Sequence, residues 1–168
     1  MQQDSNIANN FSIERTTPDQ SPVLLDMIKE LAAFEKLLDS VTATAATLRE
    51  SLAQDLIAAY FCHQDGILAG YAIIYYSFSS FEGRKGLYLE DIYIRPAFRS
   101  KGLGKAMLAF LAKRAVETGC PRFEWTCLDW NTSAQEFYQS LGATAKREWI
   151  IYRTEGEALG KMGKAVAD

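Results

Sequence analysis

The stretch from Leu89 to Leu111, LEDIYIRPAFRSKGLGKAMLAFL, determines how this chain is organised. It begins as an apolar-rich strand, which Pro96 ends because proline cannot donate a hydrogen bond to a sheet ladder. A glycine-containing turn follows, and apolar residues then recur at helical spacing from Leu103 to Thr118. The order of strand, turn and helix is typical of an α/β protein in which the turn faces an anion.

The turn itself combines glycines with basic side chains, which suits it to a phosphate group. Glycine lets the backbone approach an anion closely, and the first N–H groups of a helix have no partner within the helix. The helix dipole adds to this attraction, so the turn is expected to hold a diphosphate. The residues concerned are Arg99, Ser100, Lys101, Gly102, Leu103, Gly104 and Lys105. An ordinary strand-to-helix turn, whose glycines only permit close packing, explains the same pattern.

Two better-known phosphate loops do not fit these residues. A nucleoside-triphosphate loop needs glycine where Arg99 stands and serine or threonine where Ala106 stands. A dinucleotide-binding fingerprint needs a third glycine in place of Met107. Neither of these two loops therefore describes the turn.

Hydrophobic periodicity predicts regular structure on both sides of this stretch. Upstream, we expect a strand over 11–15, helices over 21–35 and 44–56, strands over 58–63 and 67–76, and a loop over 78–86. Downstream, we expect a strand over 123–128, a helix from Asn131 or Thr132 to Gly142, and a last strand over 148–153. The predicted fold is one mixed α/β sheet with helices on both faces. It forms a single domain over 11–153, between a disordered tail at 1–10 and a loose tail at 154–168.

Composition excludes several classes of function. The 168 residues carry 21 acidic side chains against 18 Lys and Arg, a net charge of −3 that disfavours binding to nucleic acid. The apolar run from Ile67 to Tyr76 is too short to cross a membrane. One histidine and three scattered cysteines offer neither a metal site nor a disulfide framework. We expect a soluble cytoplasmic protein with no metal, membrane or nucleic-acid partner.

The run from Tyr93 to Gly104, YIRPAFRSKGLG, resembles the acetyl-CoA-binding motif of the GNAT N-acetyltransferases. In that motif Arg or Gln, two residues, Gly, one residue and then Gly or Ala hold the pyrophosphate. The resemblance implies the GNAT fold, with a central mixed antiparallel and parallel sheet, and acetyl-CoA as cosubstrate. It assigns cofactor binding to the turn residues named above, to the preceding strand residues and to a later signature that closes over pantetheine. The strand and signature residues are Ile92, Tyr93, Ile94, Asn131, Ala134, Phe137 and Tyr138.

Two segments, IKELAAFE ending at Glu35 and LYLED ending at Asp91, resemble the diamine (spermidine/spermine) and thialysine acetyltransferases in particular. This resemblance implies that Glu35 and Glu90 are acceptor-site carboxylates and that Tyr138 is the acid near the CoA sulfur. The chain departs from the polyamine enzymes at Phe78–Glu82, where they carry an acidic segment with a tryptophan.

The side chains themselves suit acyl transfer to an amine. An alkylamine is protonated at pH 7, so the site must first collect a cation and then remove a proton, and carboxylates can do both. Glu90 is the first candidate, with Asp91, Glu35 and Glu82 as further substrate-binding residues. Tyr138 can protonate the leaving thiolate, although a tyrosine on an apolar helix face is also explained by packing. Glu35 is equally explained as a helix-end charge.

The sequence therefore predicts an N-acetyltransferase that moves acetyl from acetyl-CoA to a primary amine of a small molecule, such as a diamine, polyamine or lysine-like amine. Direct attack is expected because no cysteine lies in the turn or beside Tyr138. A protein-lysine or N-terminal acetyltransferase and a non-catalytic acyl-CoA-binding regulatory module are the alternatives. We also expect a homodimer, formed through the aromatic segment 148–152.

Overall fold

A computed structural model describes residues 10–164 of the chain. The tail predicted over 1–10 therefore falls outside the described residues except for Asn10, and the last four residues do so as well. The chain divides into two compact units between Thr126 and Cys127, which are taken in turn below. The single domain over 11–153 stays a prediction.

The first unit is built on a five-stranded sheet with the strands in chain order. The strands β1 to β4 pair antiparallel, whereas β4 and β5 pair parallel, so the predicted mixed sheet is confirmed. Their bounds are Phe11–Arg15 for β1, Ala58–Gln64 for β2, Ile67–Ser79 for β3, Arg84–Ile94 for β4 and Phe123–Trp125 for β5.

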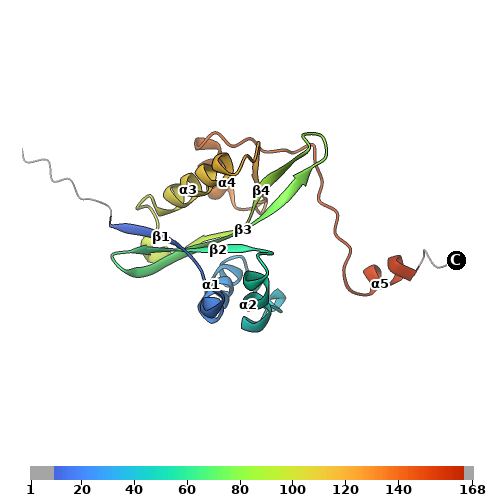
Figure 1. The fold of residues 1–168 in the computed structure, drawn as a ribbon, viewed down its shortest axis with the longest axis horizontal. Helices are drawn as coiled ribbons and strands as arrows, with labels where there is room; N and C mark the ends of the chain where they lie inside the picture. The colour runs from blue at the N-terminus through green and yellow to red at the C-terminus, as the bar shows by residue number, and fades with distance from the viewer. Residues whose placement is uncertain (1–9, 165–168) are drawn as a thin grey trace, which may run out of the picture. The chain divides into compact units, whose positions relative to one another are not determined.

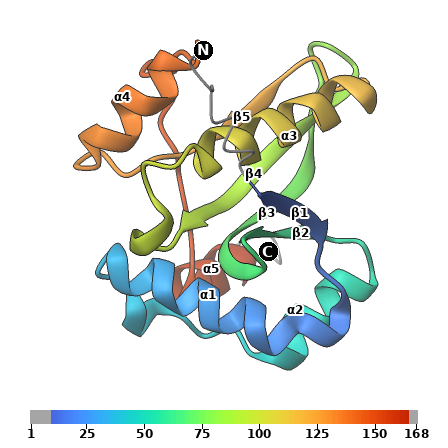
Figure 2. The same ribbon diagram turned by 90° about the vertical axis from the view of Figure 1, so that its left-hand side faces the viewer.

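Helices cover both faces of this sheet, as the sequence predicts. Figures 1 and 2 show α1 (Ser21–Phe34) and α2 (Ala45–Ala53) on one face and α3 (Leu103–Glu117) on the other. Short 3-10 turns, η1 (Pro18–Gln20), η2 (Leu38–Ser40) and η3 (Pro96–Phe98), join the elements. No helix among residues 10–164 is long and apolar enough to span a membrane.

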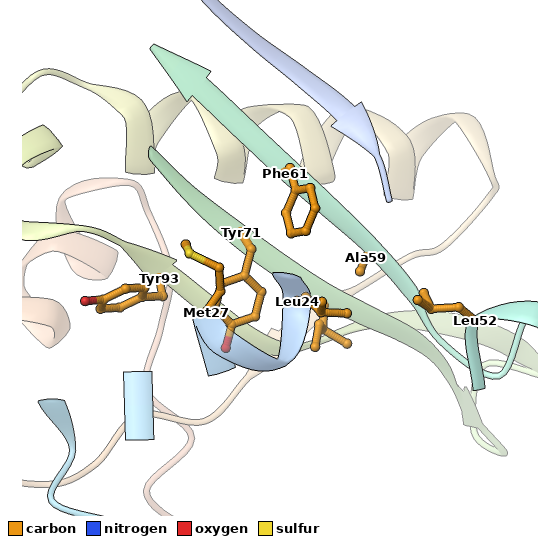
Figure 3. Close-up of a cluster of buried hydrophobic side chains, with 8 residues drawn as sticks. Leu24, Met27, Leu52, Ala59, Phe61, Tyr71 and Tyr93 are labelled. Carbon is orange, nitrogen blue, oxygen red and sulfur yellow. The ribbon is translucent and has the colours of Figure 1, made fainter. Parts of the chain in front are cut away.

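Alternation along the strands divides the core between the two faces. On the α1 side, a cluster of buried side chains joins the two helices to β2, β3 and β4, as Figure 3 shows. It consists of Leu24, Met27, Leu52, Ala59, Phe61, Tyr71, Ile73 and Tyr93. On the opposite face, Tyr60 of β2 packs edge to face against Phe110 of α3, with ring centroids 5.1 Å apart.

The hairpin of β3 and β4 is longer than predicted, so the expected loop over 78–86 is wrong. Phe78 pairs with Lys85 and Ser79 pairs with Arg84, which leaves only residues 80–83 as the turn. Gly83 has a φ of 61°, and the hydroxyl of Ser79 accepts a hydrogen bond from the backbone N–H of Glu82. This local bond and a residue in left-handed conformation allow a tight turn in a sequence rich in Ser and Phe.

The second unit contains α4 (Thr132–Ser140) and α5 (Gly156–Lys164). The start of α4 agrees with the prediction, because the side chain of Asn131 accepts the N–H of Ala134 at 3.3 Å and caps the helix. The strand predicted over 148–153 is wrong, since these residues lie outside regular structure. The loose tail predicted over 154–168 is wrong as far as Lys164, because α5 forms there.

Candidate active site

An open cavity of about 500 Å³ lies on the α1 and α2 face of the sheet. Its walls are mainly apolar, and two carboxylates, Glu90 and Asp91, project from β4 to line it. No basic side chain is found among the described residues that line it. Apolar walls with unneutralised carboxylates suit a ligand that has an aliphatic stem and a positive charge. The other lining residues are Ile28, Leu48, Ser51, Leu56, Ile57, Ile73, Tyr75 and Tyr76.

A β-bulge explains how two consecutive residues line the same cavity. Ile73 of β3 pairs with Asp91, whereas the next residue, Ile74, pairs with Leu89. Glu90 is therefore an extra residue without a partner in the ladder, and it interrupts the alternation of faces. In an unbroken strand these two side chains would point to opposite faces of the sheet. The bulge brings them to one side.

The Asp91 carboxylate is held from the sheet side by a buried tyrosine. The hydroxyl of Tyr71 on β3 donates a hydrogen bond to Oδ2 of Asp91 over 3.1 Å, and Tyr71 has no exposed surface. Burial raises the pKa of Asp91 to about 6; the Tyr71 hydrogen bond lowers it, while the negative charges of Glu90 and Glu35 raise it. Asp91 is therefore mainly ionised at neutral pH and titrates just below it.

Glu35 lies at the end of α1, where burial raises the pKa of its carboxyl group. Its charge acts on both Asp91 and Tyr71, which brings it into the electrostatic environment of the cavity carboxylates. The helix that carries it is anchored to the end of β4, because Arg95 donates to the carboxylate of Glu30 at 2.7 and 3.0 Å. This forked ion pair fixes α1 against the cavity wall.

Glu82, the remaining predicted substrate-binding residue, lies in the β3–β4 turn and is exposed. Within the described residues it is not part of the cavity lining. The structure therefore places Glu90 and Asp91 in the cavity wall. Glu35 is not among the described lining residues but acts on Asp91 through its charge, whereas Glu82 does neither.

The predicted cofactor turn lies between η3 and α3. Gly102 precedes the helix with a φ of 84°, and no atom lies within 4 Å of the position that a Cβ would occupy there. Close packing therefore does not account for this glycine, whereas its backbone conformation does. Because glycine has no side chain to cap the helix, the first N–H groups of α3 are left for another acceptor.

Two basic residues of the turn, Arg99 and Lys101, contact neighbouring parts of the chain. The Nε of Arg99 donates to the carbonyl oxygen of Ile94 at 2.8 Å, and its guanidinium lies 4.8 Å from the ring centre of Phe34. The ammonium group of Lys101 lies 5.4 Å from the ring centre of Phe98. These contacts fix the Arg99 and Lys101 side chains at the edge of the turn.

Two of the predicted cofactor residues have buried side chains. Tyr93 is 7% exposed and Leu103 is 3% exposed, so their side chains belong to the core. These two positions can therefore reach a ligand through their backbone groups. Ile92, Ile94, Ser100, Gly104 and Lys105 stand on the same strand, turn and first helical turn.

The remaining predicted residues lie on or beside α4 in the second unit. Asn131 caps the helix, as described above, and Ala134 supplies the N–H that it binds. The rings of Phe137 and Tyr138 pack with centroids 5.7 Å apart, and Tyr138 is partly buried. A helix cap is thus a structural reason for Asn131 that is independent of any ligand.

Sequence reasoning missed Tyr71 and the contribution of α2 to the cavity. Tyr71 lies inside the apolar run 67–76, where nothing distinguishes it from a core residue. Leu48 and Ser51 lie on a helix that the sequence predicts, but its position against β3 and β4 depends on tertiary packing. One feature of the sequence does point to a buried hydrogen-bond donor. Asp91 carries a charge on a strand that pairs with an apolar strand, and a buried carboxylate needs a hydrogen-bond partner.

Comparisons with known proteins show what the whole chain is similar to. The chain is 37% identical over 156 residues to a thialysine N-epsilon-acetyltransferase of Caenorhabditis elegans, covering 91% of this chain and 97% of the relative. It is 33% identical to a human spermidine/spermine N(1)-acetyltransferase-like protein, covering 90% of this chain but 24% of that longer protein. An integron cassette protein from the mobile metagenome of V. cholerae has the same fold. Its TM-score is 0.76 at 25% identity, over 92% of this chain and 98% of that one.

The model of the acetyltransferase (GNAT) family matches residues 25–143, which include the carboxylate cavity, the turn before α3 and the whole of α4. The sequence motifs, the fold and the relatives thus all indicate one enzyme class, the acetyl-CoA-dependent N-acetyltransferases. The chain belongs to the GNAT acetyltransferase family.

Proposed function

We propose that this enzyme transfers the acetyl group of acetyl-CoA to the primary amine of a small, cationic molecule such as a diamine, polyamine or lysine-like amine. The observation that carries the proposal is the β4 bulge, which places Glu90 and Asp91 together in an apolar cavity without a basic neighbour among the described lining residues. Such a cavity favours an alkylammonium ion over a neutral or anionic acceptor.

The two cavity carboxylates, Asp91 and Glu90, have different roles toward the amine. Asp91, which is mainly ionised at neutral pH, attracts the ammonium group into the cavity, with Glu35 adding to the negative potential. Glu90, which is exposed and outside the strand ladder, accepts the proton that the ammonium must lose before it can attack.

Acetyl-CoA supplies the acetyl group as a thioester. The neutral amine attacks the carbonyl carbon directly, the carbon–sulfur bond breaks, and the thiolate takes a proton from the hydroxyl of Tyr138. A backbone N–H of residues 90–93 stabilises the oxyanion that forms on the carbonyl oxygen. The amine loses two protons in all. One passes to Glu90 before the attack and then to solvent, and the other, lost after the attack, restores the hydroxyl of Tyr138 through solvent.

The turn before α3 fits the pyrophosphate of acetyl-CoA. This assignment is supported by the open space beside Gly102 and by the uncapped N–H groups at the start of α3. The basic side chains of Arg99, Lys101 and Lys105 also favour an anion there. We assign Asn131, Ala134 and Phe137 to the pantetheine arm, as the family motif implies.

The test of the activity is release of CoA thiol from acetyl-CoA in the presence of different acceptors. We expect turnover with 1,4-diaminobutane, spermidine, thialysine or L-ornithine, and none with neutral alcohols or carboxylic acids of the same length. Turnover confined to a lysine-containing peptide would instead support a protein acetyltransferase. Tight acetyl-CoA binding without turnover on any acceptor would support a non-catalytic module.

We further propose a cytoplasmic homodimer. The segment from Trp149 to Tyr152 lies outside regular structure, and its four side chains are 70–89% exposed, which is unusual for Trp, Ile and Tyr. Pairing of this segment with a second copy would cover it. Sedimentation at micromolar concentration is expected to give about twice the 18.8 kDa of one chain, and a value near one chain would contradict the proposal.

A further inference from the structure

The buried hydrogen bond between Tyr71 and Asp91 has no counterpart in the chemistry proposed so far. Tyr71 lies on β3 beside Leu24 and Met27 of α1, as Figure 3 shows, and its ring is wholly enclosed. Its hydroxyl is nevertheless directed to Oδ2 of a carboxylate that lines the cavity. Within the described residues, Oδ1 of Asp91 accepts no hydrogen bond. The Tyr71 hydroxyl therefore holds one carboxylate oxygen of Asp91, and the other oxygen is available to a ligand in the cavity.

The charges around Asp91 are almost all of one sign. Glu90 lies next to it on β4 and Glu35 acts on it from the end of α1. On β3 and β4 the nearby titratable groups are the phenols of Tyr71, Tyr75, Tyr76 and Tyr93, and α2 contributes only Leu48 and Ser51 to the cavity. The ammonium group of Lys85 lies 4.3 Å from the ring centre of Tyr76, and Lys85 is not among the described lining residues. No described cation acts on Asp91, so the Tyr71 hydroxyl is what favours its ionised form.

We propose that Tyr71 is a positioning residue for the acceptor, which holds the Asp91 carboxylate in place to receive the ammonium group. The proposal rests on the proposed function, because it needs a cationic acceptor in the cavity. Burial and the neighbouring carboxylates raise the pKa of Tyr71, so its hydroxyl remains a donor across the working range of pH. A phenol is suited to this place because it satisfies a buried carboxylate without neutralising it, as an arginine would.

Removal of the hydroxyl should act through the charge of Asp91. The Tyr71 hydrogen bond lowers the pKa of Asp91, so without it that pKa rises from about 6 toward neutrality. A larger share of Asp91 is then protonated at pH 7, and a neutral carboxylic acid does not attract an ammonium ion. At pH 9 the carboxylate is ionised in both proteins, so the difference should become small.

The experiment compares Tyr71→Phe with the wild type, using thialysine and 1,4-diaminobutane as probes. The phenylalanine ring fills the same space, so the core should be retained. We expect the KM for the amine at pH 7 to rise roughly three- to tenfold, with kcat and the KM for acetyl-CoA within about twofold of wild type. At pH 9 the KM values should converge.

Tyr60→Phe is the matched control. Tyr60 is a buried tyrosine on the neighbouring strand, packs on the α3 face, and has a hydroxyl without a hydrogen-bond partner in the described residues. It should leave the amine KM unchanged at both pH values. In the Asp91→Asn background, Tyr71→Phe should have no further effect on the amine KM, because there is no carboxylate left to ionise.

Each result is decisive. An amine KM that is unchanged, or that rises equally at pH 7 and pH 9, would overturn the role of Tyr71, and so would a Tyr71→Phe variant that fails to fold, since the hydroxyl would then serve the core. Failure of the wild-type enzyme to acetylate any amine would refute the proposed function itself.

Discussion

Glu90 and Asp91 are consecutive residues of one strand, yet both carboxylates line the same cavity. The shift in register between Ile73 and Ile74 is the cause, since it leaves Glu90 unpaired and ends the alternation of faces. The enzyme thus gains two negative charges on one wall of the cavity.

The pKa of Asp91 predicts a pH-dependent gain in stability when this residue is replaced. Its pKa is about 6 in the folded protein against an ordinary value of 3.8, so the folded state binds the proton more tightly than the unfolded chain does. Stability is therefore lost as the pH rises from about 4 to 6, by at most roughly 3 kcal/mol.

Asp91→Asn has no charge to bury and should not suffer this loss. We expect the variant to unfold at a higher urea concentration than the wild type at pH 8, with the two converging at pH 4. Groups that do not interact with Asp91 titrate equally in both proteins and cancel in the difference. A variant that is less stable than the wild type at pH 8 would contradict the burial of the Asp91 charge.

The conformation of Gly102 predicts that a β-branched residue there will abolish acetyl-CoA binding. Gly102→Val places a side chain in the open space beside the turn and strains a backbone φ of 84°. Calorimetric titration with CoA should show no measurable heat of binding.

Gly119→Val is the control for backbone strain, because Gly119 has a φ of 72° at the other end of α3 and also has open space around it. Both variants should lose a similar amount of stability, and Gly119→Val should bind CoA normally. Equal affinity for CoA in the two variants would contradict the assignment of the pyrophosphate to this turn.

The assignment of Tyr138 as proton donor predicts a loss of turnover without a loss of cofactor affinity. Tyr138→Phe keeps the ring that packs on Phe137 but removes the hydroxyl. We expect kcat to fall roughly 10²- to 10⁴-fold while the Kd for acetyl-CoA stays within a few-fold of wild type. Tyr60→Phe, which removes a hydroxyl without a hydrogen-bond partner among the described residues, is the control. Normal turnover in Tyr138→Phe would return Tyr138 to a packing role.

Local patterns in the sequence are enough to predict most of the fold. The apolar spacing of α1, the Thr44 cap of α2 and the Pro96 stop after β4 are each determined by neighbouring residues. The β4 bulge is different, because register depends on the pairing of two strands and no residue in LYLED signals it. For the same reason Tyr71 could not be recognised as the partner of Asp91.

The errors near the C-terminus have a similar origin. Trp149 to Tyr152 has the composition of a strand, but a strand forms only with a partner, and this segment has no ladder partner in the described residues. The helix α5 has three glycines, which disfavour a helix, although its apolar side chains, none of them buried, gather on one face. An ion pair between Glu157 and Lys161, 2.9 Å apart and one turn along the helix, also supports it.

The most direct test of the carboxylate site is steady-state kinetics of Glu90→Gln with a cationic amine. Glutamine keeps the size of the side chain but can neither attract the ammonium nor accept its proton, so kcat/KM for the amine should fall roughly 100-fold. The KM for the amine should rise more than the KM for acetyl-CoA, and Glu117→Gln, an exposed position on α3, should match the wild type. An unchanged KM and kcat for the amine in Glu90→Gln would contradict the carboxylate site.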